Sequence, residues 1–143
     1  MEPVTLITGG STGIGAETAR RLLKRGHRVT ATARRAERLA GFARSAGAGA
    51  DRLLTVAGDT ADAGHVRQAV DLTMETFGRL DNVVVNAGFS LPGTLADHSP
   101  ENMRSMVLTN VLGPALVVQA VGARHGGHPL LGTTAAAAPA PRS

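Results

Sequence analysis

The sequence contains no cysteine, tryptophan or tyrosine, and only three phenylalanines among its 143 residues. Without cysteine, disulfide bonds, thiolate metal sites and cysteine nucleophiles are excluded. Without tryptophan and tyrosine, the chain lacks most of the aromatic platforms on which single-stranded nucleic acids stack. The formal net charge is +4, but the arginines are mostly scattered over expected helices and match no nucleic-acid motif. We therefore expect no nucleic-acid partner.

Long apolar runs and targeting signals are also missing. No stretch approaches the length that spans a membrane, and no basic N-terminal segment leads into a long apolar one. We therefore expect a cytoplasmic protein that does not contact a membrane. The length suits one domain with a core, and the 43% share of hydrophobic residues excludes a wholly disordered chain.

Apolar periodicity predicts strands that alternate with helices. For example, Val66, Val70 and Phe77 recur with the spacing of an amphipathic helix, which Gly78 ends. The alternation indicates an α/β fold, with a parallel sheet, right-handed crossovers and helices on both faces. The expected strands cover 4–7, 28–33, 53–57 and 80–85, and the expected helices cover 13–25, 36–46, 66–77 and 101–121.

The composition changes at Gly122. Of the 22 residues from Gly122 onward, 13 are alanine, glycine or proline, and none is acidic. Such a segment has no apolar period that a core would bury. We therefore expect one domain at residues 1–121 and a poorly ordered tail at 122–143.

Four glycines and three hydroxyl residues follow the first expected strand, in the segment TGGSTGIG at 8–15. Glycine lets the backbone approach a phosphate, and the start of the next helix offers free N–H groups and a positive dipole end. Ligands of parallel sheets bind beyond the carboxyl ends of the strands. A nucleotide site is therefore predicted here, the alternative being a merely tight turn. Its expected residues are Gly9, Ser11, Thr12, Gly13, Ile14 and Gly15.

The end of the second expected strand indicates which dinucleotide would bind. An acidic side chain usually holds a free ribose 2′-hydroxyl, whereas arginine suits a 2′-phosphate. The segment ATARR places Arg34 and Arg35 here, with no acidic residue between Arg28 and Ala36. This favours NADP over NAD. The alternative is two solvated arginines at the start of a helix, where the helix dipole disfavours cations.

The ends of the third and fourth expected strands carry small and polar residues. The segment GDTAD at 58–62 would read an adenine edge, although its first aspartate suits a turn and Asp62 suits a helix cap. In the segment NAG at 86–88, the small residues let a cofactor lie across the strand ends, and the asparagine can tie neighbouring loops together. The expected binding residues at these two ends are Asp59, Thr60, Asn86, Ala87 and Gly88.

Together the segments TGGSTGIG, ATARR, GDTAD, VVVNAG and LTNVLGP resemble the short-chain dehydrogenase/reductase family, specifically its classical NADP-preferring members, over residues 3–121. The resemblance implies a Rossmann-like doubly wound sheet, a dimer or tetramer, and hydride transfer between NADP(H) and a small carbonyl or alcohol substrate. It also makes Asn110 the helix asparagine of the catalytic site, whose carbonyl holds a water in a proton relay. Pro114 has no N–H to bond that carbonyl, which agrees with this role but also with a plain helix kink.

The resemblance does not extend to the other catalytic residues that it implies. The family uses a tyrosine as proton donor, a lysine that lowers the pKa of this tyrosine, and a serine that polarises the carbonyl. This chain has no tyrosine, and its one lysine, Lys24, falls in the first expected helix. Thr133 or Thr134 is a candidate substitute for the serine. We interpret His125 and His128 as solvent-exposed, not as acid/base groups or ligands, so no metal site is expected.

Three interpretations therefore remain open. The chain is an NADP-dependent reductase or dehydrogenase by descent, a silent NADP-binding module or partner of a full-length homologue, or a non-functional product truncated by a frame change near Gly122. Truncation after about four strands and a long helix would expose a sheet edge and an apolar helix face, so we expect poor solubility or self-association. The segment FSLPGTLADHSP at 89–100 would border a substrate without defining it.

Overall fold

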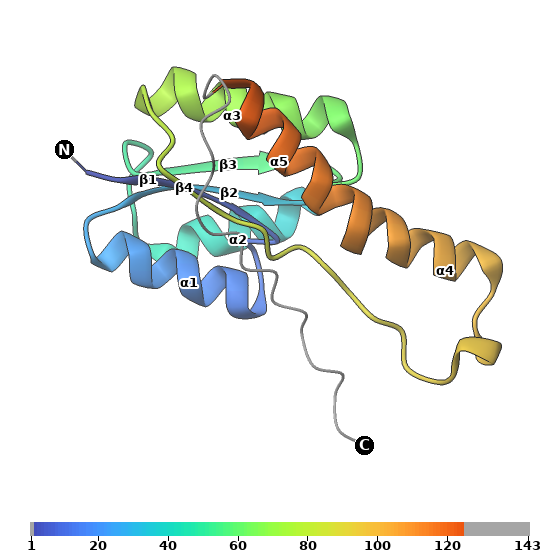
Figure 1. Ribbon diagram of the computed structural model, residues 1–143. Helices are drawn as coiled ribbons and strands as arrows, with labels where there is room; N and C mark the ends of the chain where they lie inside the picture. Colours follow the sequence, from blue (N-terminus) through green and yellow to red (C-terminus); the bar gives the residue numbers. More distant parts are fainter. Residues whose placement is uncertain (1, 125–143) are drawn as a thin grey trace.

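The computed structural model describes residues 2–124 as a parallel sheet between two layers of helices (Figure 1). Its strands lie in the order β3-β2-β1-β4, so the chain reverses its direction of growth across the sheet after β3. Every pairing in this sheet is parallel. The strands are β1 (Val4–Thr8), β2 (Arg28–Ala33), β3 (Leu53–Ala57) and β4 (Asn82–Val84), and the main helices are α1 (Gly13–Lys24), α2 (Ala36–Ala46), α3 (Ala63–Phe77), α4 (Pro100–Val107) and α5 (Gly113–Arg124).

Each face of the sheet buries its own apolar cluster. Helices α1 and α2 cover one face, where Ile7, Val29 and Phe42 are buried together. Helices α3 and α5 cover the other, where Leu6 and Val117 belong to the second cluster. Because helices cover both faces of the sheet, β1 is buried at all five positions, including Thr5 and Thr8.

The expected bounds of β2, α2 and β3 agree with the structure, whereas β4 is shorter than the expected strand at 80–85. Side chains take part in the hydrogen bonding at both ends of β4, although the Asp81 amide still donates to the Val4 carbonyl (2.9 Å). At its start, the Asp81 carboxylate accepts a hydrogen bond from the Val4 amide (2.8 Å). At its end, the amides of Asn86 and Ala87 donate to the Thr8 hydroxyl (3.0 and 3.1 Å) instead of a strand carbonyl.

The long helix expected at 101–121 is a continuous helical run with a π-helical segment, η2 (Leu108–Leu112), between α4 and α5. The Gly113 amide donates to the Leu108 carbonyl, five residues earlier. Pro114 has no N–H and cannot continue the α-helical ladder here, so the widened turn replaces the simple kink that the sequence also allowed. The helix continues through Arg124, past the expected domain boundary at Gly122. The rest of the expected tail lies outside the described residues.

The run Pro100–Arg124 is 25 residues long and, by length and composition alone, could cross a membrane. The expectation that no stretch reaches this length was therefore wrong, because the segment between Arg104 and Arg124 carries no charged residue. In this fold Val117, Ala120 and Val121 are buried in the domain core. The run therefore serves as a packed helix of the domain over its C-terminal half.

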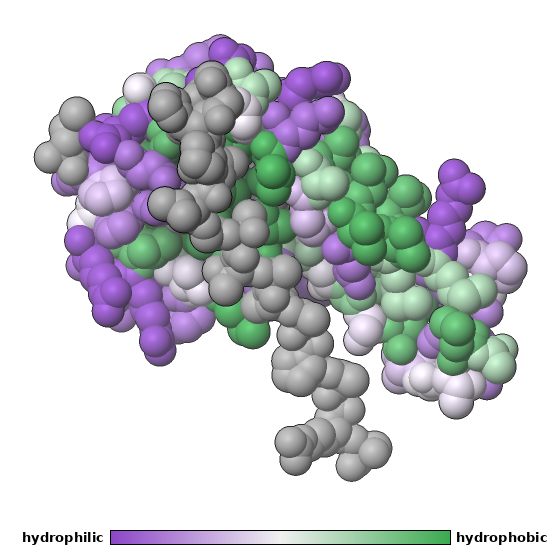
Figure 2. All heavy atoms as spheres, in the orientation of Figure 1, coloured by the Kyte–Doolittle hydropathy of each residue, from purple (hydrophilic) through white to green (hydrophobic). Residues whose placement is uncertain are grey.

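The other half of this run projects away from the sheet. No residue of α4 is buried, and Figure 1 shows α4 with the preceding loop as an arm beside the two layers. Figure 2 shows apolar side chains gathered over this run, in agreement with the exposure of Val107, Val111 and Val118 (57, 63 and 42%). The expected exposed apolar helix face is therefore present. Strand β4 also forms one edge of the sheet among residues 2–124.

Candidate functional site

The glycine-rich loop between β1 and α1 packs tightly against the segment that follows β4. A Cβ on Gly9 would lie 2.9 Å from the Ala87 Cα, and one on Gly15 would lie 2.6 Å from the Asn86 Nδ2. Gly9 also has a φ of +65°, which side chains disfavour. The Asn86 side-chain amide donates to the Gly9 carbonyl (3.2 Å) and so ties the two loops together.

A cavity of about 220 Å³ opens at the carboxyl ends of the strands, beside this loop. It combines residues from the glycine loop, the end of β2, the turn after β3, the segment after β4 and the η2 segment. Parallel sheets bind ligands in this place. The lining residues are Gly9, Ser11, Thr12, Thr32, Ala33, Arg34, Arg35, Arg38, Gly58, Thr60, Ala87, Gly88, Phe89 and Thr109.

Three arginines give the cavity its charge. Arg34 and Arg35 follow β2, and Arg38 lies in the first turn of α2. All three side chains are exposed, and none makes a hydrogen bond or ion pair with another described residue. No aspartate or glutamate is among the lining residues described, so the cavity suits an anion.

The turn after β3 contributes its backbone and a threonine. The Asp59 carboxylate accepts a hydrogen bond from the Ala61 amide (2.9 Å) and does not line the cavity, whereas Thr60 does. Asp62 caps α3, with its side chain accepting from the Gly64 amide (2.8 Å). The role of Asp59 at an adenine edge therefore stays a prediction, while its turn geometry is visible.

A buried histidine supports this turn from below. A Cβ on Gly58 would clash with the ring of His65, 2.6 Å from its Cε1, so the imidazole packs directly against the Gly58 backbone. His65 is 7% exposed, and its Nδ1 has no hydrogen-bond partner among the described residues. Burial lowers the pKa of the imidazole, against the opposing charges of Asp62 and Asp59.

Asn110 lies in the η2 segment and is held by the chain after β4. Its Oδ1 accepts from the Phe89 amide (3.0 Å), and its Nδ2 donates to the Phe89 carbonyl (2.7 Å). A Cβ on Gly88 would lie 3.1 Å from the Asn110 Oδ1, so a small residue is favoured there. The asparagine expected from the helix is thus fixed at the same strand ends as the cavity.

Some of the expected binding residues do not line the cavity, namely Gly13, Ile14, Gly15, Asp59 and Asn86. Gly13 has a φ of +55° and open space around it, and the Ile14 side chain is 51% exposed.

Lys24 is at the opposite end of α1 from the glycine loop. Thr133, Thr134, His125 and His128 lie outside the described residues. Within the described part of the chain, no group of acidic and histidine side chains is arranged to hold a metal ion.

The lining residues that sequence reasoning did not name as binding residues are Thr32, Ala33, Arg38, Gly58, Phe89 and Thr109. Arg38 belongs to the first turn of α2, and the expected helix at 36–46 already places it near the end of the second strand. Phe89 and Thr109 are brought to the cavity by the hydrogen bonds between Asn110 and the Phe89 backbone, for which the sequence gives no local signal.

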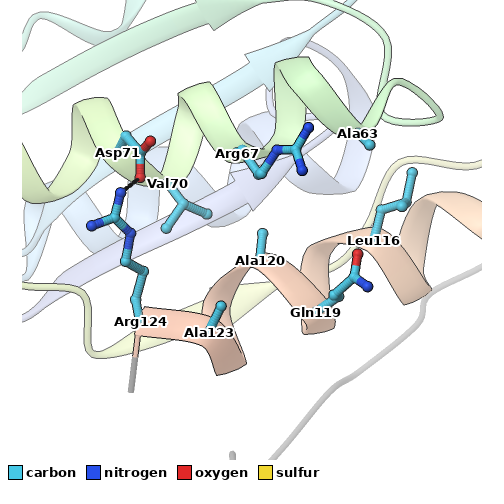
Figure 3. A pocket seen from close by; sticks show the side chains of 9 residues that line it. All are labelled: Ala63, Arg67, Val70, Asp71, Leu116, Gln119, Ala120, Ala123 and Arg124. Atoms are coloured by element: carbon cyan, nitrogen blue, oxygen red, sulfur yellow. Dashed lines mark hydrogen bonds and ion pairs between the residues drawn. The ribbon is translucent and has the colours of Figure 1, made fainter. Parts of the chain in front are cut away.

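A second cavity, of about 330 Å³, lies between α3 and α5 (Figure 3). Its lining includes Val70, Leu116 and Ala120, and an ion pair between Asp71 and Arg124 closes one end. It is lined by residues of these two helices alone, with neither the glycine loop nor a strand end. We therefore identify the strand-end cavity as the candidate site.

A glycine-rich loop at the carboxyl ends of a parallel sheet in the order 3-2-1-4 defines a Rossmann-like dinucleotide-binding fold. The family model of the short chain dehydrogenases matches residues 3–126. The chain therefore belongs to the short-chain dehydrogenase family.

Similar proteins agree with this assignment and are longer than this chain. The chain is 41% identical over 125 residues to 2-(R)-hydroxypropyl-CoM dehydrogenase of Xanthobacter autotrophicus, covering 85% of this chain and 50% of that protein. It is 36% identical over 121 residues to oxidoreductase BOA17 of Botryotinia fuckeliana, covering 85% of this chain and 43% of that protein. The chain thus spans about half the length of the curated relatives it matches.

Solved structures show the same fold over the same part. A short chain dehydrogenase from Bacillus anthracis superposes with a TM-score of 0.82 at 30% identity, covering 85% of this chain and 49% of that one. ElxO with NADP bound superposes with a TM-score of 0.78, also at 30% identity, covering 87% of this chain and 50% of that one.

Proposed function

We propose that this chain binds NADP(H) in the strand-end cavity, in preference to NAD(H), and that its 143 residues do not transfer hydride by themselves. The observation that carries the proposal is the arginine cluster at the end of β2. Three exposed arginines, whose side chains have no partner among residues 2–124, line the same cavity as the glycine loop. An acidic residue, which would receive a free ribose 2′-hydroxyl, is absent from the described lining.

The residues present suit a dinucleotide. The close packing of Gly9 against Ala87 leaves backbone instead of side chains at the cavity wall, which admits a pyrophosphate near the start of α1. Ser11 and Thr12 offer hydroxyl donors beside it. Arg34 and Arg35 would hold the 2′-phosphate through charge-assisted hydrogen bonds. The remaining expected contacts, from Thr60, Ala87 and Gly88, would border the adenosine and the nicotinamide side.

The proposal that the chain does not transfer hydride by itself depends on which proton donors it contains. Bound NADPH would supply a hydride for a small carbonyl substrate, and the chain would have to supply the proton. The Asn110 side chain is held by the Phe89 backbone beside the cavity. The relay role that the family resemblance implies for this asparagine would fit descent from an oxidoreductase that acts on carbonyl or alcohol substrates. However, the chain has no tyrosine, and Lys24 is remote from the cavity. We therefore propose a binding module, whether it acts alone or beside a full-length homologue.

Calorimetric titration of the purified chain with NADPH, and in parallel with NADH, tests this function. We expect NADPH to bind at least about tenfold more tightly, since a charge-assisted contact to phosphate contributes about 1.5–3 kcal/mol. NADPH oxidation with a panel of small ketones and aldehydes should stay at the background rate. Equal affinity for the two dinucleotides, or binding of neither, would contradict the proposal.

A further inference from the structure

We infer that Arg38 is a specificity-determining residue, which binds the 2′-phosphate of the dinucleotide together with Arg34 and Arg35. The inference rests on the proposed binding of NADP(H). It adds a residue of helix α2 to the two arginines that follow β2. Arg38 belongs to α2, one turn beyond the residue that precedes the helix, Arg35.

The geometry places the three guanidinium groups around one volume. Arg34, Arg35 and Arg38 all line the strand-end cavity, together with Ser11 and Thr12 of the glycine loop. Arg35 is the extended residue just before α2, and Arg38 lies in the first turn of that helix, so both side chains start near the N-terminal end of α2. Arg38 therefore reaches the cavity from the helix, while Arg34 reaches it from the end of the strand.

The charges around Arg38 leave a place for an anion. Arg21, Arg28 and Arg79, by contrast, pair with carboxylates of the chain. Arg38 has no such partner among the described residues, and the positive end of the α2 dipole disfavours cations in its first turn. The one acidic residue in that turn, Glu37, does not line the cavity. A phosphate carrying nearly two negative charges would offset this concentration of positive charge.

Arg38 is expected to act on discrimination more than on binding in general. Its guanidinium would contact only the 2′-phosphate, a group that NADH lacks. Arginine is suited to this task because its planar fork can donate two parallel hydrogen bonds to one phosphate. Lysine at this position would keep the charge but lose the fork, and so would retain only part of the preference.

The experiment compares Arg38→Gln with Arg44→Gln in the full chain. Arg44 is in the last turn of the same helix, is exposed and does not line the cavity, so its substitution changes the net charge equally. Each protein is titrated with NADPH, NADH, 2′,5′-ADP and 5′-AMP, and its thermal unfolding is recorded. The two adenine nucleotides separate recognition of the 2′-phosphate from recognition of the rest of the cofactor.

We expect Arg38→Gln to weaken binding of NADPH and 2′,5′-ADP about tenfold, which corresponds to loss of one charge-assisted contact. Binding of NADH and 5′-AMP, and the unfolding temperature, should not change. Arg44→Gln should match the wild type throughout. Arg38→Lys should fall between the wild type and Arg38→Gln for NADPH.

Two results would overturn the inference while leaving the proposed function in place. One is NADPH binding by Arg38→Gln that equals that of Arg44→Gln. The other is an equal loss of NADPH and NADH binding together with a lower unfolding temperature, which would indicate a structural role. Failure of the wild-type chain to bind NADPH would instead overturn the proposed function, and this inference with it.

Discussion

Gly15 occupies a position in α1 that has no room for a side chain. A Cβ there would meet the Gly9 carbonyl as well as the Asn86 side chain. Gly15→Ala should therefore lower the free energy of unfolding by about 1–3 kcal/mol, the usual cost of overpacking, and should weaken NADPH binding by displacing the loop. Urea unfolding and calorimetry measure the two effects.

Gly122→Ala is the matched control, because Gly122 lies in α5 with open space around its Cα. This change should leave stability unchanged or raise it by up to about 1 kcal/mol, since alanine favours helix. A Gly15→Ala protein as stable as the control would show that the loop relaxes without cost.

The buried imidazole of His65 should make stability dependent on pH. Its pKa is lowered below the ordinary value of 6.5, mainly by burial, so the folded state prefers the neutral ring. The stabilisation is complete above the unfolded pKa and is lost as the pH falls through 6.5 toward the folded pKa, where the unfolded state binds the proton more readily.

Urea midpoints measured between about pH 8 and about pH 5 would check this linkage. The wild type should lose stability toward acid, and His65→Gln should lose less of it over the same window. The more exposed His98 serves as the control, so His98→Gln should retain the wild-type dependence. Identical profiles for the wild type and His65→Gln would assign the acid sensitivity to other groups.

At the level of single residues, the sequence predicts those parts of the site that follow strand ends. The predicted binding residues Gly9, Ser11, Arg34, Thr60 and Gly88 all line the strand-end cavity, because the carboxyl ends of parallel strands meet at one edge. Asp59 shows the limit of such reasoning. Its carboxylate accepts a hydrogen bond from the Ala61 amide, two residues later. Whether such a side chain bonds its own turn or a ligand depends on the turn geometry, which the residue spacing does not specify.

Helix α3 depends on its N-cap. The Asp62 carboxylate accepts from the amides of Gly64 and His65, and so satisfies donors that have no partner within the helix. Asp62→Ala should reduce the free energy of unfolding by about 1 kcal/mol, with an effect on the adjacent turn after β3. Urea unfolding should show a lower midpoint with an unchanged slope.

Glu75→Ala provides the control for this element. Glu75 is exposed on the same helix, and its side chain makes no hydrogen bond or ion pair with another described residue. Its replacement should change stability by less than about 0.5 kcal/mol. An equal loss in both variants would mean that the removed charge, and not the cap, stabilises α3.

Element bounds were predictable where local pattern decides them. Strands β2 and β3 and helix α2 are flanked by turn residues and match their expected ranges. Strand β4 and the π-helical segment do not, because distant or alternative partners determine them. Thr8 ends the β4 ladder from 78 residues away, and a proline in a helix is compatible with either a kink or a widened turn.

The helical run from α4 to α5 exposes several large apolar side chains to solvent. Val107, Val111 and Val118 lie on the run from α4 to α5, and β4 leaves a sheet edge beside the same layer. Such surfaces favour association. We expect the chain to self-associate at micromolar concentrations, and Val111→Glu to shift it toward the monomer in sedimentation velocity.

Thr76→Glu is the control for charge, since Thr76 is exposed on α3, away from the apolar run. It adds the same negative charge and should leave association unchanged. A wild-type chain that sediments as a single monomeric species would contradict the expectation for this surface.

The strand order also has a consequence for how the molecule assembles in time. The β1–β2 and β2–β3 pairs join strands that are neighbours in sequence. The Val4 amide, in contrast, bonds the carboxylate of Asp81, which lies 77 residues later. Contacts between residues so far apart in sequence form slowly, because the entropy of closing a long loop is lost before the contact stabilises the fold. The Gly9 carbonyl gains its Asn86 partner only in that step. During refolding, sheet signals should therefore precede dinucleotide binding, and a nascent chain would become competent for its ligand only after residue 88 has been made.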